Sequence, residues 1–208
     1  MKIKAIIFDM DGVLIEAKEW HYESLNSALS LFGSEISRYD HLVTFDGLPT
    51  RKKLEMLSAD GRIPQGLHKF INELKQQYTV DLIHTRCKPI FQHQYALAKL
   101  KSQNYKIAVC SNSIRNTIEL MMDKSGLRNH LDFIISNQDV VNGKPDPEMY
   151  IKAIDRFNLT PGECLILEDN ENGIKAALAS GANLLKVDTP KDVSYQNIVN
   201  KIKEIENA

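Results

Sequence analysis

Short apolar runs rich in isoleucine and valine alternate along the chain with longer segments of helical periodicity. This alternation predicts βα units around a parallel sheet. The runs expected to form strands nearly all end at a polar cluster, and they span 3–8, 106–110, 131–136, 164–168 and 184–187. Helices are expected between them at 113–124, 147–157 and 172–180. The pattern therefore predicts an α/β fold with a Rossmann-like parallel-sheet core.

Residues 16–86 interrupt this alternation. Successive helical patterns follow one another there without a convincing strand, and the clearest of them span 20–32, 50–57 and 66–83. Because the segment directly follows the first strand, we interpret it as an insertion. The predicted organisation is a helical cap domain, residues 16–86, inserted into an α/β core domain made of residues 1–15 and 87–208.

The charge balance and the cysteines narrow the class of protein. Among 208 residues, 26 Lys and Arg face 27 Asp and Glu, so no global field attracts nucleic acid or an anionic membrane. No stretch approaches the roughly 20 apolar residues of a membrane span, and Asp9 and Asp11 interrupt the N-terminal apolar run too early for a signal sequence. Cys87, Cys110 and Cys164 lack metal-ligand spacing and are expected to be buried free thiols. We predict a cytoplasmic monomer that binds neither nucleic acid nor membrane.

Polar side chains gather at one edge of the predicted sheet. The carboxyl ends of parallel strands meet at one crevice, where ligands bind. The residues expected there are Asp9, Asp11, Gly12, Ser111, Asn112, Lys144, Glu168, Asp169 and Asn170. Four carboxylates in one small space need a cation, because each would otherwise raise the pKa of its neighbours. Mg²⁺ is the natural partner, since it prefers oxygen ligands and is completed by substrate phosphate.

Each of these residues also has an ordinary structural explanation. Asp and Gly at the end of the first strand form turns in many proteins, and Ser111 with Asn112 could cap a helix. Lys144 could be a loop lysine, and Glu168 with Asp169 could simply end a strand. Their arrangement at successive strand ends favours a functional site.

With these motifs the sequence resembles the haloacid dehalogenase superfamily, in particular its beta-phosphoglucomutase-like branch, which carries a helical cap. The segments of the core that match are DMDGVL at 9–14, CSN at 110–112, KPDP at 144–147 and LEDNENGIKAALASG at 167–181. The cap matches through WHYESL at 20–25 and GLPTRKKL at 47–54, with lower specificity.

The resemblance implies a Mg²⁺-dependent phosphatase that hydrolyses a small phosphate monoester through an aspartyl-phosphate. In that family scheme Asp9 would be the nucleophile and Asp11 the general acid and base. Ser111 and Lys144 would contact the transferring phosphoryl group. The metal would be held by Asp9, Asp11, Glu168 and Asp169. Asp11 indicates a phosphate ester, because relatives that cleave other bonds lack the second aspartate.

Two other functions stay open at this stage: a sugar-phosphate mutase and a non-catalytic protein that binds a phosphorylated ligand. A mutase needs a cap cation for a second phosphate, but Thr50 occupies the position of the mutase arginine, with Arg51 one residue later. His21 matches the mutase and also occurs in phosphatases of this branch. The side chains expected to bind substrate, a small phosphorylated metabolite, are Asn112, His21, Thr50 and Arg51. After the cap, we expect His84, Arg86 and His93 at the surface or at a hinge.

Overall fold

The computed structural model describes residues 2–207 and divides into two compact units. The core unit comprises Met1–Glu16 and Lys88–Ala208, and the cap unit comprises Ala17–Cys87. The assignment of residues 16–86 as a separate cap domain remains a proposal.

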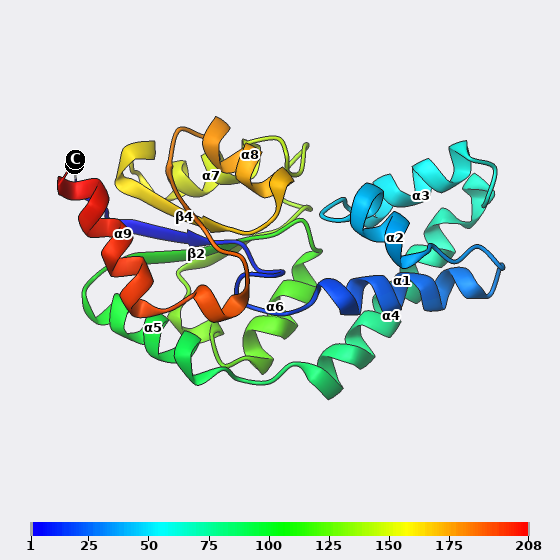
Figure 1. The fold of residues 1–208 in the computed structure, drawn as a ribbon, viewed down its shortest axis with the longest axis horizontal. Coiled ribbons are helices and arrows are strands. Elements are labelled where there is room, and N and C mark those ends of the chain that lie inside the picture. Colours follow the sequence, from blue (N-terminus) through cyan, green and yellow to red (C-terminus); the bar gives the residue numbers. More distant parts are fainter. Residues whose placement is uncertain (1, 208) are drawn as a thin grey trace. The chain divides into compact units, whose positions relative to one another are not determined.

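A five-stranded parallel sheet forms the centre of the core unit (Figure 1). Its strands are β1 (Ala5–Phe8), β2 (Lys106–Cys110), β3 (Phe133–Ile135), β4 (Cys164–Glu168) and β5 (Asn183–Lys186). They lie in the order β3-β2-β1-β4-β5, and every neighbouring pair is parallel. Because β1 is central, Phe8 lies opposite both Val109 of β2 and Leu167 of β4. The carboxyl ends of these three strands are therefore neighbours, as the sequence predicts.

Helices cover both faces of this sheet. Those of the core unit are α5 (Phe91–Ser102), α6 (Arg115–Lys124), α7 (Glu148–Phe157), α8 (Glu171–Ala179) and α9 (Tyr195–Asn207), with short 3-10 helices at Arg128–His130, Pro161–Glu163 and Pro190–Asp192. The helices α7 and α8 lie over one face and α5, α6 and α9 over the other (Figure 1). The strands β1 and β4 are buried along their whole length, which explains their mainly apolar character.

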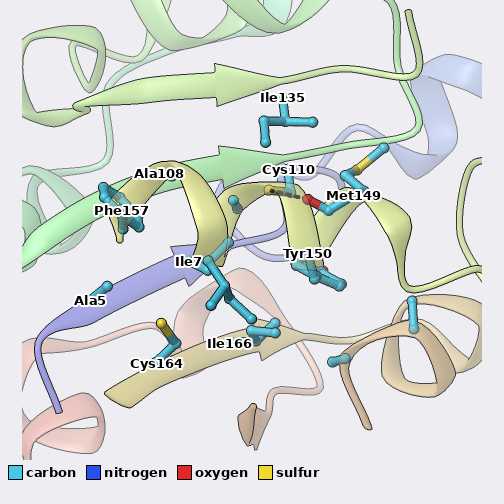
Figure 2. Packing of buried hydrophobic residues seen from close by; sticks show 14 of the residues in the cluster. Ala5, Ile7, Ala108, Cys110, Ile135, Met149, Tyr150, Phe157, Cys164 and Ile166 are labelled. Atoms are coloured by element: carbon cyan, nitrogen blue, oxygen red, sulfur yellow. Dashed lines mark hydrogen bonds between the residues drawn. The ribbon is translucent and has the colours of Figure 1, made fainter. Parts of the chain in front are cut away.

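One face of the sheet packs against α7 in a continuous apolar cluster. Alternate strand residues such as Ile7, Cys110 and Ile166 point to this face, and α7 contributes Met149 and Tyr150 (Figure 2). The buried residues of α7 recur at spacings of three and four along the helix, so one side of α7 is apolar and packs on the sheet. This apolar packing therefore fixes the position of α7 against the sheet.

The predicted elements of the core unit are confirmed, with small shifts at their ends. The predicted first strand begins later, at Ala5, and the third is limited to Phe133–Ile135. Before the third strand, the Asp132 carboxylate accepts the Ile107 N–H at 2.7 Å, while the Asp132 N–H donates to the Ile107 carbonyl oxygen at 2.8 Å. The helices α5 and α9 were not among those predicted.

The cap unit is entirely helical. Its elements are α1 (Lys18–Ser30), α2 (Arg38–Asp40), a π-helical turn at His41–Phe45, α3 (Thr50–Ala59), a 3-10 turn at Gln65–Leu67 and α4 (His68–Arg86). Leu25 and Leu29 of α1, Leu54 and Leu57 of α3 and Ile71 of α4 form its buried apolar cluster. The prediction of successive helices without a strand is confirmed.

The cysteines and one histidine test the expectations about exposure. Cys87, Cys110 and Cys164 are buried and form no disulfide, as predicted. His93 was predicted at the surface or at a hinge. The prediction of a surface position is wrong, because His93 is buried and its Nε2 lies 2.7 Å from the Pro190 carbonyl oxygen. Since α5 packs on the chain segment after Thr189, its first turn faces inward there. No described helix is long and apolar enough to cross a membrane.

Candidate active site

A tight turn holds two aspartates at the end of β1. Gly12 has a φ of +91°, a conformation that glycine adopts without steric cost. Its N–H donates to the Ile15 carbonyl oxygen at 2.7 Å, and the Met10 carbonyl oxygen accepts the Ile15 N–H at 2.9 Å. The turn places Asp9 and Asp11 at the carboxyl edge of the sheet. The DMDG segment therefore forms a turn, and that turn carries the carboxylates.

A buried lysine bridges two carboxylates that come from different strand ends. The ammonium nitrogen of Lys144 lies 2.5 Å from Asp9 Oδ1, 2.6 Å from Glu168 Oε1 and 2.9 Å from the Cys110 carbonyl oxygen. These three acceptors match the three protons of the ammonium group. Lys144 is therefore a buried member of the site and not simply a lysine of a surface loop.

Burial and charge act in opposite directions on the pKa values of this group. Desolvation raises the pKa of Asp9, and the neighbouring Glu168 carboxylate raises it further, against the opposing charge of Lys144. Burial lowers the pKa of Lys144, but the Asp9 and Glu168 carboxylates outweigh burial and raise it overall. Lys144 therefore stays protonated, and its charge is what allows two acids to lie so close together.

Glu168 accepts hydrogen bonds at both of its carboxylate oxygens. Besides Lys144, the Tyr150 hydroxyl donates to Oε1 at 2.5 Å, while the Asp169 N–H donates to Oε2 at 3.1 Å. Gly173 of α8 lies against the same carboxylate, since a Cβ there would approach its atoms to 1.9–2.2 Å. Glu168 is therefore confined on all these sides. Tyr150 was not predicted as a site residue, because its sequence signal is only an aromatic residue with a hydroxyl group on the buried side of α7.

Two hydroxyl groups after β2 orient Asp11. Ser111 Oγ donates to Asp11 Oδ2 at 3.3 Å, and Ser113 Oγ donates to the same oxygen at 3.1 Å. The Ser113 N–H donates to Ser111 Oγ at 3.0 Å, which fixes the two hydroxyls relative to each other. Ser113 was also missed by the sequence analysis, although a second hydroxyl two residues after Ser111 was a usable signal.

The Asn112 side chain forms two hydrogen bonds with the main chain of Lys144. Its Oδ1 accepts the Lys144 N–H at 3.0 Å, and its Nδ2 donates to the Lys144 carbonyl oxygen at 3.2 Å. Gly143 leaves room for this amide, because a Cβ there would lie 2.6 Å from Asn112 Oδ1. The expected contact between Asn112 and substrate stays a prediction.

Three carboxylates lie close enough to hold a metal ion together. One oxygen each from Asp9, Glu168 and Asp169 lies within 4.8 Å of the others. The N-cap Asn170, whose side chain accepts the Asn172 N–H at 2.9 Å, starts α8 immediately after Asp169. An all-oxygen donor set of this kind fits Mg²⁺. Asp11 Oδ2 faces the two serine hydroxyls, and the expected bond between Asp11 and the metal stays a prediction.

The cap residues expected to bind substrate lie on α1 and α3 of the cap unit. His21 Nδ1 is 3.3 Å from Lys75 Nζ of α4. Thr50 begins α3, and Arg51 Nε donates to Glu55 Oε1 at 2.9 Å while its side chain remains 89% exposed. An exposed ion pair of this kind holds a side chain weakly. The roles of His21, Thr50 and Arg51 toward substrate stay predictions.

Comparison with known proteins adds independent information. The model of the haloacid dehalogenase-like hydrolase family matches residues 6–187. A phosphorylated carbohydrates phosphatase of Thermotoga maritima is 26% identical, over 98% of this chain and 100% of that protein. A pyrophosphatase of Bacillus mycoides is 27% identical, over 90% of this chain and 84% of that protein.

A solved structure shares the fold. The crystal structure of beta-phosphoglucomutase from Clostridium difficile matches with a TM-score of 0.85 and 24% identity, over 99% of this chain and 100% of that one. At this identity the likeness bears on the fold alone, and it confirms the predicted α/β architecture.

Proposed function

The chain belongs to the haloacid dehalogenase-like hydrolase family, and from this premise we propose that it is a Mg²⁺-dependent phosphatase of small phosphate monoesters. The observation that carries the proposal is the buried Lys144, which bridges Asp9 and Glu168, two of the three carboxylates of the acidic cluster. A fixed positive charge beside a carboxylate nucleophile suits the transfer of a phosphoryl group, because negative charge spreads over the phosphoryl oxygens during the reaction.

In the proposed first step Asp9 attacks phosphorus. A bond forms between a carboxylate oxygen and phosphorus, the ester P–O bond breaks, and the leaving oxygen takes a proton from Asp11. Lys144 holds the Asp9 carboxylate in one orientation, and its charge neutralises the approaching phosphoryl oxygens. The two hydroxyls of Ser111 and Ser113 keep the Asp11 carboxylate in one place, where a second carboxyl group is needed.

In the second step water restores the enzyme. Asp11, now deprotonated, takes a proton from a water molecule while the oxygen of that water attacks phosphorus. The bond between phosphorus and Asp9 breaks, and inorganic phosphate leaves. The same carboxyl group thus serves first as acid and then as base, so it regains its proton in each cycle.

The acidic cluster would hold the metal. We propose Asp9 and Asp169 as its principal carboxylate ligands, with the Asp11 main-chain carbonyl and Glu168 completing the protein's contribution. Glu168 comes second because its Oε1 already accepts from Lys144 and Tyr150. A bound Mg²⁺ supplies positive charge that offsets the carboxylates and the substrate phosphate.

The substrate class is a small phosphorylated metabolite, such as a sugar, polyol or amino-alcohol phosphate. The name of the Thermotoga maritima relative supports a phosphorylated carbohydrate, whereas the Bacillus mycoides relative is named a pyrophosphatase. The cap unit, including Arg51 with its exposed guanidinium group, is proposed to select among them. A mutase is less well supported, because Thr50 occupies the position of the mutase's cap arginine. A cytoplasmic location and a monomeric state stay predictions.

The experiment that tests this proposal is a screen of phosphate release. The full-length protein is incubated with a panel of phosphorylated metabolites, with Mg²⁺ and again with excess EDTA. We expect release from at least one sugar or polyol phosphate that depends on Mg²⁺ and is abolished by Asp9→Asn. Release that persists in EDTA would overturn the metal-dependent mechanism. Mg²⁺ binding without release from any compound would favour the non-catalytic alternative.

A further inference from the structure

We propose that Tyr150 of α7 is a positioning residue, which keeps Glu168 engaged with Lys144 and thereby holds the lysine on the nucleophile Asp9. This inference rests on the proposed function and assigns a role to a residue outside the matching motifs. Tyr150 itself is not placed to touch substrate. It acts through two neighbours.

The geometry joins the tyrosine to the lysine in two ways. The Tyr150 hydroxyl donates to Glu168 Oε1 at 2.5 Å, and Lys144 Nζ donates to the same oxygen at 2.6 Å. In addition, Lys144 Nζ lies 4.7 Å from the centre of the Tyr150 ring, within the range of a cation–π contact. The hydroxyl thus fixes the partner of the lysine, and the ring supports the lysine itself.

The burial of Tyr150 indicates that its hydroxyl group has a role beyond packing. Tyr150 is fully buried, and its ring packs in the apolar cluster between α7 and the sheet (Figure 2). A phenylalanine would fill the same space, so packing alone does not call for a hydroxyl group. A buried hydroxyl is costly unless it is hydrogen-bonded, and Glu168 is the acceptor that the structure provides.

The Glu168 carboxylate can interact either with a metal ion or with Lys144. A further hydrogen bond, from Tyr150, therefore helps to fix its orientation. It belongs to the acidic cluster with Asp9 and Asp169, and it also forms the ion pair with Lys144. A carboxylate between a cation site and a lysine can turn toward either. The Tyr150 hydroxyl donates to the oxygen that faces Lys144, which favours the orientation of Glu168 that keeps the lysine in place. Loss of the hydroxyl should therefore lower the rate of the chemical step more than the binding of substrate.

The test is the kinetics of Tyr150→Phe with p-nitrophenyl phosphate as the probe. We expect kcat to fall by about 5- to 50-fold, with KM within about twofold of the wild-type value, because the lost hydrogen bond acts on the reacting groups. The matched control is Tyr195→Phe in α9, which also removes a hydroxyl with a hydrogen-bond partner, the Gln103 amide at 2.7 Å. The control should keep kcat within about twofold.

A double-mutant cycle with Lys144→Met shows whether the effect of Tyr150→Phe on the rate depends on Lys144. If Tyr150 acts through the lysine, adding Tyr150→Phe to Lys144→Met should lower the single-turnover rate by less than about twofold. An unchanged kcat in Tyr150→Phe with a lower melting temperature would overturn the proposal and leave the hydroxyl a purely structural role. An undiminished further loss in the Lys144→Met background would also overturn it. Failure of the proposed function would look different, since the wild-type protein itself would then release no phosphate.

Discussion

The ammonium nitrogen of Lys144 lies 2.5 Å from Oδ1 of Asp9, although 135 positions separate the two residues in the chain. Both side chains are largely buried, and the contact joins the turn after β1 to the loop before α7. This ion pair holds the carboxylate of the proposed nucleophile in a defined orientation. Preorganised charge of this kind is a major source of catalytic power in enzymes.

Replacement of the lysine tests this arrangement. Lys144→Met should lower kcat/KM by about 10²- to 10³-fold, as the loss of one preorganised charge does in other enzymes. It should also lower the free energy of unfolding by about 3 kcal/mol, since two buried carboxylates lose their counter-charge. Lys175→Met is the control, because Lys175 forms an exposed ion pair with Glu171 on α8. Steady-state kinetics and urea unfolding check both effects, and a loss no larger than that of the control would contradict the role of Lys144.

Glu168, which ends β4, and Asp169, which follows it, should differ in their effect on metal binding. Asp169→Asn should raise the Mg²⁺ concentration for half-maximal activity by about 10- to 100-fold, because a ligand loses its charge. Glu168→Gln should raise it by less than about fivefold, since Glu168 is occupied mainly by Lys144 and Tyr150, and should act chiefly on kcat. Calorimetric titration with Mg²⁺ gives the same comparison without catalysis. A larger effect of Glu168→Gln would show that Glu168 is a principal ligand.

Gly173 in α8 should tolerate no side chain. A Cβ at this position would lie 1.9 Å from Glu168 Oε1, so Gly173→Ala must displace the carboxylate or the helix. We expect a loss of about 1–3 kcal/mol in the free energy of unfolding, together with a fall in kcat, although alanine ordinarily favours a helix over glycine by ~1 kcal/mol. The matched control is Gly66→Ala, where a Cβ would meet nothing within 4 Å. Equal stability and activity of the two variants would contradict the close packing of Gly173 on Glu168.

A carboxylate near the end of β3 should make stability depend on pH. Burial raises the pKa of Asp139, but hydrogen bonds from Arg115 and Ser136 outweigh burial and lower the pKa to about 2. Since the pKa is lower in the folded state than in the unfolded chain, the contribution of Asp139 is complete above about pH 4 and is lost as the pH falls toward 2. The difference in urea midpoint between wild type and Asp139→Asn should therefore shrink from pH 5 to pH 3. A difference that stays constant or grows on acidification would contradict this assignment.

Much of the core site could be predicted from the sequence because of one rule of geometry. Parallel strands end at a common edge, so residues placed directly after strands, such as Asp9 and Asp169, must become neighbours. The strands themselves were recognisable as unbroken apolar runs, since the sheet is buried on both faces. The core residues of the prediction therefore come together in the structure.

The contacts that direct the site could not be predicted in the same way. Whether Tyr150 donates to Glu168, or whether Asn112 holds the Lys144 backbone, depends on the rotation of helices and the course of loops. No periodic pattern records these features. His93 shows the same limit, because its burial follows from how α5 packs on the segment near Pro190. Sequence patterns thus locate the reacting groups, whereas three-dimensional packing decides which groups support them.

The most direct test of the account is the chemical identity of the phosphorylated residue. The protein is mixed with a ³²P-labelled substrate identified by the release screen, quenched in acid within one turnover, reduced with borohydride and digested. The account predicts label on the protein after the acid quench, and conversion of Asp9 to homoserine in the peptide that contains it. Asp9→Asn should carry neither signal, and Asp11→Asn should show altered formation and breakdown of the phosphoenzyme. Phosphate release without any labelled protein, or label on Asp9→Asn equal to that on the wild type, would contradict the central claim that Asp9 is the nucleophile.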